Sequence, residues 1–394
     1  MSDGKKGTLK KEENEAEERY HSGFLTFFLT LAAVLLVVLL AAYRDGTGFD
    51  VLRRYLNYGA AERAGDEIIY DYDASAKNRF AAQGENLFVL SDTSFSLLDK
   101  HGGEIWTVPV NMGSPALHCN GGRAVAYDVG GTSLYLADEG GIIKDLSVPE
   151  DEPLIAATLN SDGYLAVTSE KKGRKGSVSV YNPNMGQAFV FDSSRRFVLD
   201  ACVVGETLAA VTLGQENGVF VSNIVLYDMP EYDTPGDEPT ASYNISGGLA
   251  IAIGAQERKI VTVSDTCLTY ASTEGEVAAS YSYKGAYLRE YDLGGEGFAA
   301  LLLNRYRSGS VGRLVTVDSS GNELGSLEVR EEILGISASG RYLAVLYSNR
   351  LVIYNDDLQP YASLQGTDYA RGVLMRPDGS ALVLASESAS LFLP

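Results

Sequence analysis

From about Asp66 onward, the chain consists of short apolar runs that alternate with polar turns. Runs rich in Val, Leu, Ile, Tyr and Ala are separated by Gly, Asp, Asn and Ser about every 8 to 12 residues. A helix would place its apolar residues three and four positions apart, and this spacing is rare here. Short runs between regular turns are typical of antiparallel strands. We therefore predict an all-β domain over residues 67–394.

Two half-motifs recur along this domain. The first is an apolar strand, a turn with Gly and a second apolar strand, as in LNSDGYLAVTS (159–169) and ISASGRYLAVLY (336–347). The second places Asp or Asn before a Gly-rich turn, as in LLDKHGGEIW (97–106) and TVDSSGNELGSL (316–327). Gly supplies a positive φ, and Asp or Asn side chains close a turn on their own backbone. Both half-motifs therefore predict hairpins.

The half-motifs alternate, with a mean step of about 42 residues for each pair. Each pair supplies four strands, and this repeat length is typical of one blade of a β-propeller. The pattern predicts a propeller with eight four-stranded blades, with seven as the alternative. The innermost strands are expected to begin near Arg79, Pro115, Pro153, Phe197, Leu249, Ala286, Ile333 and Ala370.

The last repeat has room for only three strands, at about 370–375, 380–385 and 389–393. One unassigned strand candidate, EIIYDYD (67–73), precedes the first repeat. If it completes the last blade, the ring closes without leaving an open sheet edge, which would invite aggregation.

An uncharged apolar segment, Phe24–Ala42, lies near the N-terminus. As a helix it would be about 28 Å long, close to the thickness of the hydrocarbon core of a bilayer. It is longer than a signal-peptide core and lacks the polar face of a buried soluble helix. We expect a single transmembrane helix over 24–42. Lys and Arg before it outnumber those just after it, which favours a cytoplasmic N-terminus and an extracellular propeller.

The segments on either side of this helix differ in character. Residues 1–23 are short, charged and poor in apolar residues, and we expect a disordered cytoplasmic tail. Residues 43–66 are expected to form a juxtamembrane stalk. Within it, Phe49, Leu52 and Leu56 have helical spacing, which predicts a short amphipathic helix.

The formal net charge is −20, and nearly all of it falls on the predicted propeller. A strongly acidic domain argues against nucleic acid as a partner and against adsorption to anionic lipid. The three cysteines, Cys119, Cys202 and Cys267, are odd in number and widely spaced. They suit neither a disulfide framework nor a zinc site. A disulfide-poor extracytoplasmic domain weakly favours a Gram-positive surface protein.

No motif for catalysis or phosphate binding is present: G-x-S-x-G, H-E-x-x-H and G-x-x-x-x-G-K-[ST] are all missing. The acidic stretch 228–239 lacks the spacing of an EF-hand, so a solvated loop is expected there. We therefore assign no catalytic residue, metal site or cofactor. Charged residues in or near innermost strands could still contact a ligand in the central channel. These candidates are Asp200, Arg289, Glu290, Asp292 and Arg371.

The segment LLDKHGGEIW (97–106) resembles the repeat of pyrroloquinoline-quinone-type and WD40-like propellers, in which a strand-ending Trp docks one blade on the next. Only Trp106 fits this pattern, because the chain has a single Trp. The other blades end the motif with Leu, Phe, Tyr or Ser, so a quinone cofactor is not expected.

The full layout resembles the uncharacterised bacterial family called domain of unknown function 5711. That resemblance rests on the order of the segments and on the pattern of the repeats, and it covers essentially the whole chain. It implies a short cytoplasmic tail, one transmembrane helix and a propeller-like ectodomain, in the cell envelope of Gram-positive, Clostridia-like bacteria.

These features favour a non-catalytic binding or scaffold module that presents a face or channel to a protein or cell-wall partner. Two alternatives remain: a propeller enzyme, either quinone-dependent or carbohydrate-active, and a ligand sensor that signals through the helix. The first prediction rests on the absence of a catalytic constellation and on the common use of propellers as interaction surfaces.

Overall fold

A computed structural model describes residues 27–38, 50–64, 68–229 and 238–394. The chain divides into two compact units, Met1–Arg63 and Ala64–Pro394. In the first unit, residues 27–38 are helical and α2 spans Asp50–Ala64. No helix of the described residues is both long and apolar enough to cross a membrane. Residues 24–26 and 39–42 of the predicted span, the tail 1–23 and the loop 230–237 lie outside the described part.

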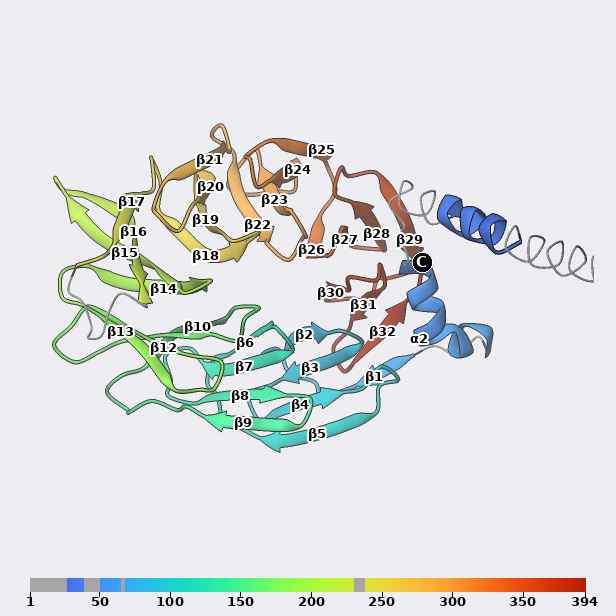
Figure 1. The fold of residues 1–394 in the computed structure, drawn as a ribbon, viewed down its shortest axis with the longest axis horizontal. Helices are drawn as coiled ribbons and strands as arrows, with labels where there is room; N and C mark the ends of the chain where they lie inside the picture. Colours follow the sequence, from blue (N-terminus) through green and yellow to red (C-terminus); the bar gives the residue numbers. More distant parts are fainter. Residues whose placement is uncertain (1–26, 39–49, 65–67, 230–237) are drawn as a thin grey trace, which may run out of the picture. The chain divides into compact units, whose positions relative to one another are not determined.

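The second unit is a propeller of eight four-stranded sheets, which confirms the predicted fold class (Figure 1). The strands of blades 1 to 4 are β2 (Arg79–Gln83), β3 (Asn86–Leu90), β4 (Ser94–Leu98), β5 (Glu104–Pro109), β6 (Pro115–Asn120), β7 (Arg123–Asp128), β8 (Leu134–Asp138), β9 (Gly141–Asp145), β10 (Leu154–Leu159), β11 (Leu165–Ser169), β12 (Gly176–Tyr181), β13 (Gln187–Ser193), β14 (Phe197–Val204), β15 (Thr207–Glu216), β16 (Val219–Asp228) and β17 (Ala241–Asn244).

The strands of blades 5 to 8 are β18 (Ala250–Gln256), β19 (Lys259–Ser264), β20 (Cys267–Ala271), β21 (Val277–Ser282), β22 (Tyr287–Asp292), β23 (Phe298–Asn304), β24 (Gly312–Asp318), β25 (Glu323–Val329), β26 (Ile333–Ser339), β27 (Tyr342–Tyr347), β28 (Arg350–Asn355), β29 (Pro360–Gln365), β30 (Gly372–Met375), β31 (Ala381–Leu384), β32 (Ser388–Phe392) and, from the N-terminal side, β1 (Ile69–Asp71). Each innermost strand begins within two residues of its predicted start.

Blade 8 closes the ring by joining the two ends of the domain. Its sheet has the order β1-β32-β31-β30, so three C-terminal strands are completed by one N-terminal strand, as predicted. The pairing is antiparallel, with Ile69 opposite Ser390 and Asp71 opposite Ser388. The N-terminal strand therefore covers the outer edge of β32.

Asp and Asn residues close the turns between the third and fourth strands, as the second half-motif predicted. Asp99 Oδ1 accepts from the backbone N–H groups of His101 and Gly103, both at 2.8 Å. Asp318 Oδ1 accepts in the same way from Ser320 and Asn322, at 2.9 and 2.8 Å. These bonds satisfy turn N–H groups and fix the hairpin register.

The apolar core lies between neighbouring blades, so each sheet stacks on the next. Phe88 and Phe95 of blade 1, for example, pack in one cluster with Ala124 and Ala126 of blade 2. Trp106 belongs to the edge of this cluster, and its indole N–H donates to the carbonyl of Asp138 in blade 2 at 3.2 Å. Trp106 therefore links one blade to the next in the way that the propeller resemblance implied.

The antiparallel order gives the propeller two distinct faces. We call the face at which the innermost strands begin the start face. It carries the loops before the first strand and between the second and third strands of each blade. The end face carries the turns between the first and second and between the third and fourth strands. Because β1 is a fourth strand, the chain enters the propeller at the end face and reaches the start face after Asp71.

Candidate functional site

Each innermost strand has one edge that is not paired within its own sheet and faces the central channel. Unpaired backbone groups on such an edge need partners. Asp200 in β14 supplies one: its carboxylate accepts from the N–H of Ala201 at 2.8 Å and, in the next blade, from the N–H of Ile253 at 3.4 Å. Glu290 in β22 accepts from the N–H of Ile336 in the next blade at 3.1 Å.

A polar side chain joins every blade to the backbone of the following blade. The eight junctions are made by Gln83 to Gly122, Asn120 to Leu159, Asn160 to Val203, Asp200 to Ile253, Gln256 to Gly295, Glu290 to Ile336, Ser337 to Met375 and Arg376 to Glu85. In each of the eight bonds the side chain belongs to one blade and its backbone partner to the next blade, with blade 8 followed by blade 1. The polar residues near the ends of the innermost strands therefore hold the ring together.

Burial in the channel wall changes the acidity of several of these groups. Desolvation raises the pKa of Asp200 to about 6, against two backbone hydrogen bonds that lower it. Burial likewise raises the pKa of Asp292 to about 6 and that of Glu290 above its usual value. Burial lowers the pKa of His118 to about 4, and its Nδ1 accepts from the N–H of Leu159 at 3.1 Å. At neutral pH this histidine is a neutral acceptor.

The five predicted channel residues do not converge on one site. Asp200, Glu290 and Asp292 bind backbone N–H groups, with Asp292 Oδ1 accepting from Gly294 at 2.7 Å. Arg289 and Arg371 lie instead at the start face, where both side chains are exposed. Their role as ligand contacts stays a prediction.

A register shift near the beginning of five innermost strands explains why Arg289 lies outside the channel wall. The shift occurs in β10, β14, β18, β22 and β26, and each leaves one extra residue in the strand. Such a bulge re-aims a side chain. The extra residues include Ile251 and Leu334, which are exposed at the start face, and Arg289.

A polar hollow of about 770 Å³ opens at the end face among the turns of blades 2 to 5. The amides that line it, Asn120, Asn160 and Gln256, already bind backbone carbonyls of the next blade. In the part of the chain that the structure describes, no cluster of three or more His, Cys, Asp or Glu is placed to hold a metal ion. The described turns of this face are rich in acidic residues: Glu85, Asp99, Asp138, Glu139, Asp162, Glu206, Glu257, Glu274, Glu296, Asp318, Asp356, Asp357 and Asp378.

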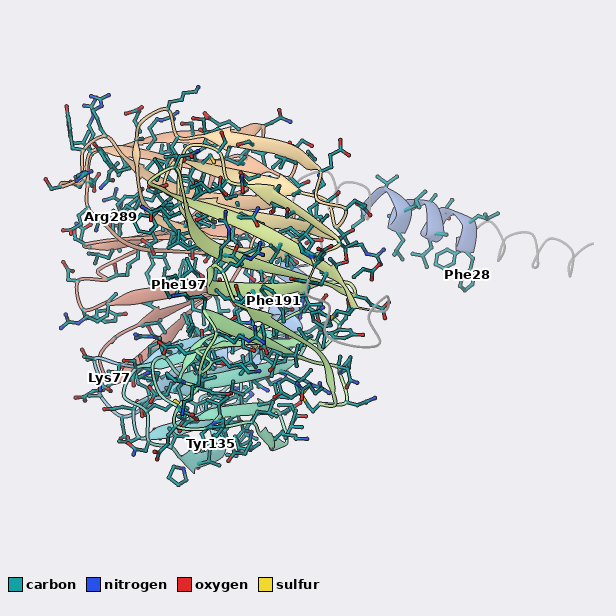
Figure 2. The ribbon with its side chains drawn as sticks, turned by 90° about the vertical axis from the view of Figure 1, so that its left-hand side faces the viewer. Phe28, Lys77, Tyr135, Phe191, Phe197 and Arg289 are labelled. Atoms are coloured by element: carbon teal, nitrogen blue, oxygen red, sulfur yellow. The ribbon has the colours of Figure 1, made fainter. Side chains whose placement is uncertain are left out.

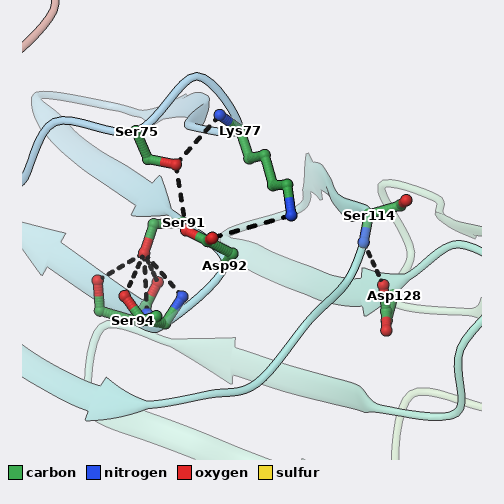
Figure 3. A network of polar contacts seen from close by, with 8 residues as sticks. Ser75, Lys77, Ser91, Asp92, Ser94, Ser114 and Asp128 are labelled. Carbon is green, nitrogen blue, oxygen red and sulfur yellow. Dashed lines mark hydrogen bonds and ion pairs between the residues drawn. The ribbon is translucent and has the colours of Figure 1, made fainter.

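On the start face, some carboxylates fix the loops, whereas others, such as Asp73, Glu150 and Asp368, are exposed. Asp92 accepts from the hydroxyl of Ser75 at 3.1 Å and lies 3.9 Å from the ammonium of Lys77 (Figure 3). Asp128 accepts from the N–H of Ser114 at 2.6 Å, also shown in Figure 3. In each case a loop between the second and third strands binds the segment that leads into the first strand. These acidic residues are therefore engaged within the face.

Lysines and arginines gather on this start face. Figure 2 shows Lys77 and Arg289 on the same side of the propeller, with Phe197 between them. The basic residues of the start face are Lys77, Arg79, Lys171, Lys172, Arg174, Lys175, Arg195, Arg196, Lys284, Arg289, Arg305, Arg307, Arg313, Arg330, Arg350 and Arg371. Those of the end-face turns are fewer: Lys100, Arg123, Arg258, Lys259, Arg341 and Arg376.

Exposed large apolar side chains follow the same division. Among the described residues of the propeller, they lie either on fourth strands or on the start face, and none lies in an end-face turn. Those of the start face are Val129, Phe197, Val219, Phe220, Leu249, Ile251, Tyr287, Tyr306, Val311, Leu334 and Tyr369. Aromatic residues and Arg are enriched in protein interfaces. The start face is therefore the candidate functional surface.

Sequence reasoning missed this surface because its residues come from many separate loops. One local signal was present: the segment QENGVF (215–220) has an Asn-Gly pair between two strands. Asn217 and Gly218 both have positive φ, 51° and 83°, as a tight type I′ hairpin turn requires. A hairpin at the start face, with exposed Val219 and Phe220, could have been predicted from it.

Comparison with known proteins identifies the family. A family model described as "Family of unknown function (DUF5711)" matches residues 62–360. This chain belongs to DUF5711. The matched range covers blades 1 to 6 of the DUF5711 propeller and the first three strands of blade 7, and it includes strand β1. No curated protein matches the sequence.

Solved structures with a similar fold have little sequence identity to this DUF5711 member. A eukaryotic initiation factor is 10% identical, with a TM-score of 0.51 over 80% of this chain and 84% of that chain. The dihydro-heme d1 dehydrogenase NirN, in complex with DHE, is 11% identical, with a TM-score of 0.50 over 75% and 67%. AztD from Citrobacter koseri is 12% identical, with a TM-score of 0.49 over 75% and 86%. At these identities the likeness to the initiation factor and to NirN shows the propeller fold alone.

Proposed function

We propose that this DUF5711 member is a membrane-anchored, extracytoplasmic propeller that acts as a non-catalytic binding or scaffold module in the bacterial cell envelope. Its partner, a protein or a cell-wall component, would dock on the start face. The observation that carries this proposal is the gathering of exposed apolar and basic side chains on one face.

Around the channel mouth, exposed apolar side chains come from blades 5, 6 and 7 and from the loop that leads into blade 8. The bulges expose Ile251 by 53% and Leu334 by 39%, and Tyr287 and Tyr369 are exposed by 42% and 51% in neighbouring blades. Exposed apolar groups with a polar and charged rim are typical of binding surfaces. The rim here includes Arg289.

The membrane anchor of the proposal rests on the apolar segment 24–42 and on the Lys and Arg residues before it. Labelling of intact cells with a membrane-impermeant maleimide tests both anchoring and orientation, because the three native cysteines are free but partly or fully buried. We expect labelling of a Ser308→Cys variant, in an exposed loop, and none of a Thr8→Cys variant until the cells are lysed. The reverse pattern would contradict the orientation.

Crosslinking of the full chain in its native membrane tests the binding role. We expect Ile251→Ser with Leu334→Ser to reduce recovery of the crosslinked partner about tenfold, since interface energy concentrates in a few central residues. The matched control is Val277→Ser with Leu324→Ser, which removes exposed apolar side chains from fourth strands. Equal recovery from both variants would contradict docking at the start face.

A further inference from the structure

The hairpin formed by β15 and β16 of blade 4 projects at the start face beyond the first residue of β14, the innermost strand of that blade. Strand β14 begins at Phe197, opposite Leu213. Beyond that point β15 and β16 continue to pair with each other, through Gly214 with Val221 up to Glu216 with Val219. The tip of the hairpin therefore stands beyond the first residue of the strand beneath it.

Arg196 holds this extension in place. Its side chain lies on Gly214, where an added Cβ would come within 2.8 Å of the Arg196 Cγ. Its guanidinium donates to the carbonyl of Val221 at 3.2 Å and pairs with Glu216. The hairpin is thus fixed at both strands and does not need to be ordered when it meets a partner.

The tip presents two apolar side chains that a flat protein surface would not cover together. Val219 is 65% exposed and Phe220 60% exposed. Adjacent residues of a strand point to opposite sides. A rigid partner docked on one side of the hairpin would leave the other side in water, whereas the fluid interface of a bilayer surrounds both.

Exposed cations lie in the loops beside the base of the hairpin. They are Lys172, Arg174, Lys175 and Arg195. Two observations place their loops there: the carbonyl of Lys175 accepts from the N–H of Val198, and its ammonium lies 4.6 Å from the centre of the Phe197 ring. None of the four forms an ion pair with a carboxylate in the described ranges, whereas Lys171 and Arg196 are paired with Asp192 and Glu216.

We propose that this hairpin and its four neighbouring cations form a contact site for an anionic lipid surface. Val219 and Phe220 would enter the boundary between headgroups and acyl chains, and the cations would meet the lipid phosphates. An apolar tip beside basic residues suits this boundary. Each cation close to an anionic membrane strengthens binding roughly fivefold. The start face also carries carboxylates, and the loops of this site hold Glu170, Asp192 and Glu216, of which the last two pair with Lys171 and Arg196. Six cations therefore stand against three carboxylates at the contact, so its local charge is positive although that of the whole chain is −20.

This inference rests on the proposed function in one respect, because the segment 24–42 is taken as the anchor that holds the chain at a bilayer.

Depth-dependent fluorescence quenching in the full chain tests the proposal. The protein is reconstituted into vesicles of brominated phosphatidylcholine, with or without phosphatidylglycerol, and carries Phe220→Trp. We expect the emission added by this substitution to fall at least about twofold in anionic vesicles. Trp106, the one native Trp, serves as internal reference, and Val277→Trp on a fourth strand is the matched control. Both should keep their emission.

Neutralising the cations with Lys172→Gln, Arg174→Gln, Lys175→Gln and Arg195→Gln should restore most of the lost emission. Equal quenching with and without phosphatidylglycerol would overturn the proposal, and so would no quenching at all. If an acidic protein or polymer covered the Phe220→Trp side chain, and brominated lipid did not quench its emission, the site would belong to that partner instead.

The anchor is measured separately in the same vesicles. Quenching is recorded first, and alkaline carbonate then extracts proteins that do not span the bilayer. A retained but unquenched protein overturns only the hairpin contact. An extracted protein overturns the anchor, and any quenching recorded before extraction still supports the hairpin contact.

Discussion

The two faces of the propeller use their polar side chains differently. At the end face and along the channel wall, amides, carboxylates and a buried arginine bind the backbone of the next blade, as Gln256 and Arg376 do. At the start face, carboxylates bind neighbouring loops or pair with cations, and many cations and apolar side chains remain exposed. One end of each blade thus maintains the ring, and the other offers a surface.

This difference separates residues that matter for stability from residues that matter for recognition. Polar groups in buried positions cost free energy when they lose a partner. Exposed groups that contact only water can be replaced at little cost. Substitutions on the two faces should therefore have opposite consequences for unfolding and for binding.

The largest loss of stability is expected for Arg376→Ala at the junction of blades 8 and 1. This side chain is only 1% exposed, and its guanidinium donates to the hydroxyl of Tyr70 at 3.1 Å and to the carbonyl of Glu85 at 2.8 Å. Its removal leaves a cavity and loses charge-assisted bonds at the closure. We expect about 3–4 kcal/mol less stability, measured by thermal unfolding in detergent. Arg371→Ala on the start face is the control, with a change below about 0.5 kcal/mol.

A second effect should appear in the pH dependence of stability. Because the folded-state pKa of Asp200 is raised to about 6, above the ordinary value of 3.8, folding favours the protonated carboxyl. Its contribution is complete below about pH 4 and is lost as the pH rises through about 6. Asp200→Asn should flatten the stability profile in this window by on the order of 3 kcal/mol.

The control for that profile is Asp162→Asn, which changes an exposed carboxylate in an end-face turn. Its profile from pH 4 to pH 7 should match that of the unchanged protein. His118 and Asp292 titrate in the same window, so the effect of Asp200 is taken as the difference between the wild-type and Asp200→Asn profiles. Parallel profiles would show that Asp200 is not held in the environment described.

A smaller loss is expected for Gln256→Ala. The Gln256 Nε2 donates to the carbonyls of Gly295 at 2.8 Å and Phe298 at 2.6 Å, and its Oε1 accepts from the hydroxyl of Tyr270 at 3.0 Å. Loss of this buried amide leaves the two carbonyls and the Tyr270 hydroxyl without this hydrogen-bond partner, which lowers the free energy of unfolding by about 2 kcal/mol. Urea unfolding measures it, with the exposed Gln215→Ala in the start-face hairpin as control. Equal losses from both would contradict the division between the faces.

The smallest effect on stability should come from Val219→Ser combined with Phe220→Ser. Both side chains are exposed and the backbone pairing of the hairpin is kept, so unfolding should shift by less than about 0.5 kcal/mol. The proposed contact with anionic vesicles should nevertheless be lost. A large loss of stability would show that these side chains pack against the propeller in solution.

The sequence carried enough information to predict the blades because hairpin chemistry is local. Asp99 and Asp318 close turns on residues two and four positions ahead, and such signals recur once per blade. The pairing of residues 67–73 with the last blade was also predictable. The last repeat lacked one strand, and one strand candidate remained before the first repeat. Closure of the sheet edge requires that match.

The candidate surface could not be predicted from the sequence in the same way. Asp200 and Glu290 were predicted as possible channel contacts because they are charged and lie in or near innermost strands. That they also bind N–H groups about fifty residues later in the chain could not be predicted. Arg289 was a candidate of the same kind, and a bulge turns it onto the start face. Long-range partners and bulges are decided by packing between blades.

The sequence by itself determined the number of blades, the hairpins within them and the strand that closes the ring, because each depends on turn residues and on alternation along a short segment. Only the tertiary structure decided how charge and apolar surface are distributed. The net charge of −20 indicated an acidic domain but not where the charges lie on it. Folding instead brings loops from all blades to two opposite faces, and the side to which a residue belongs depends on the direction of its strand in the ring.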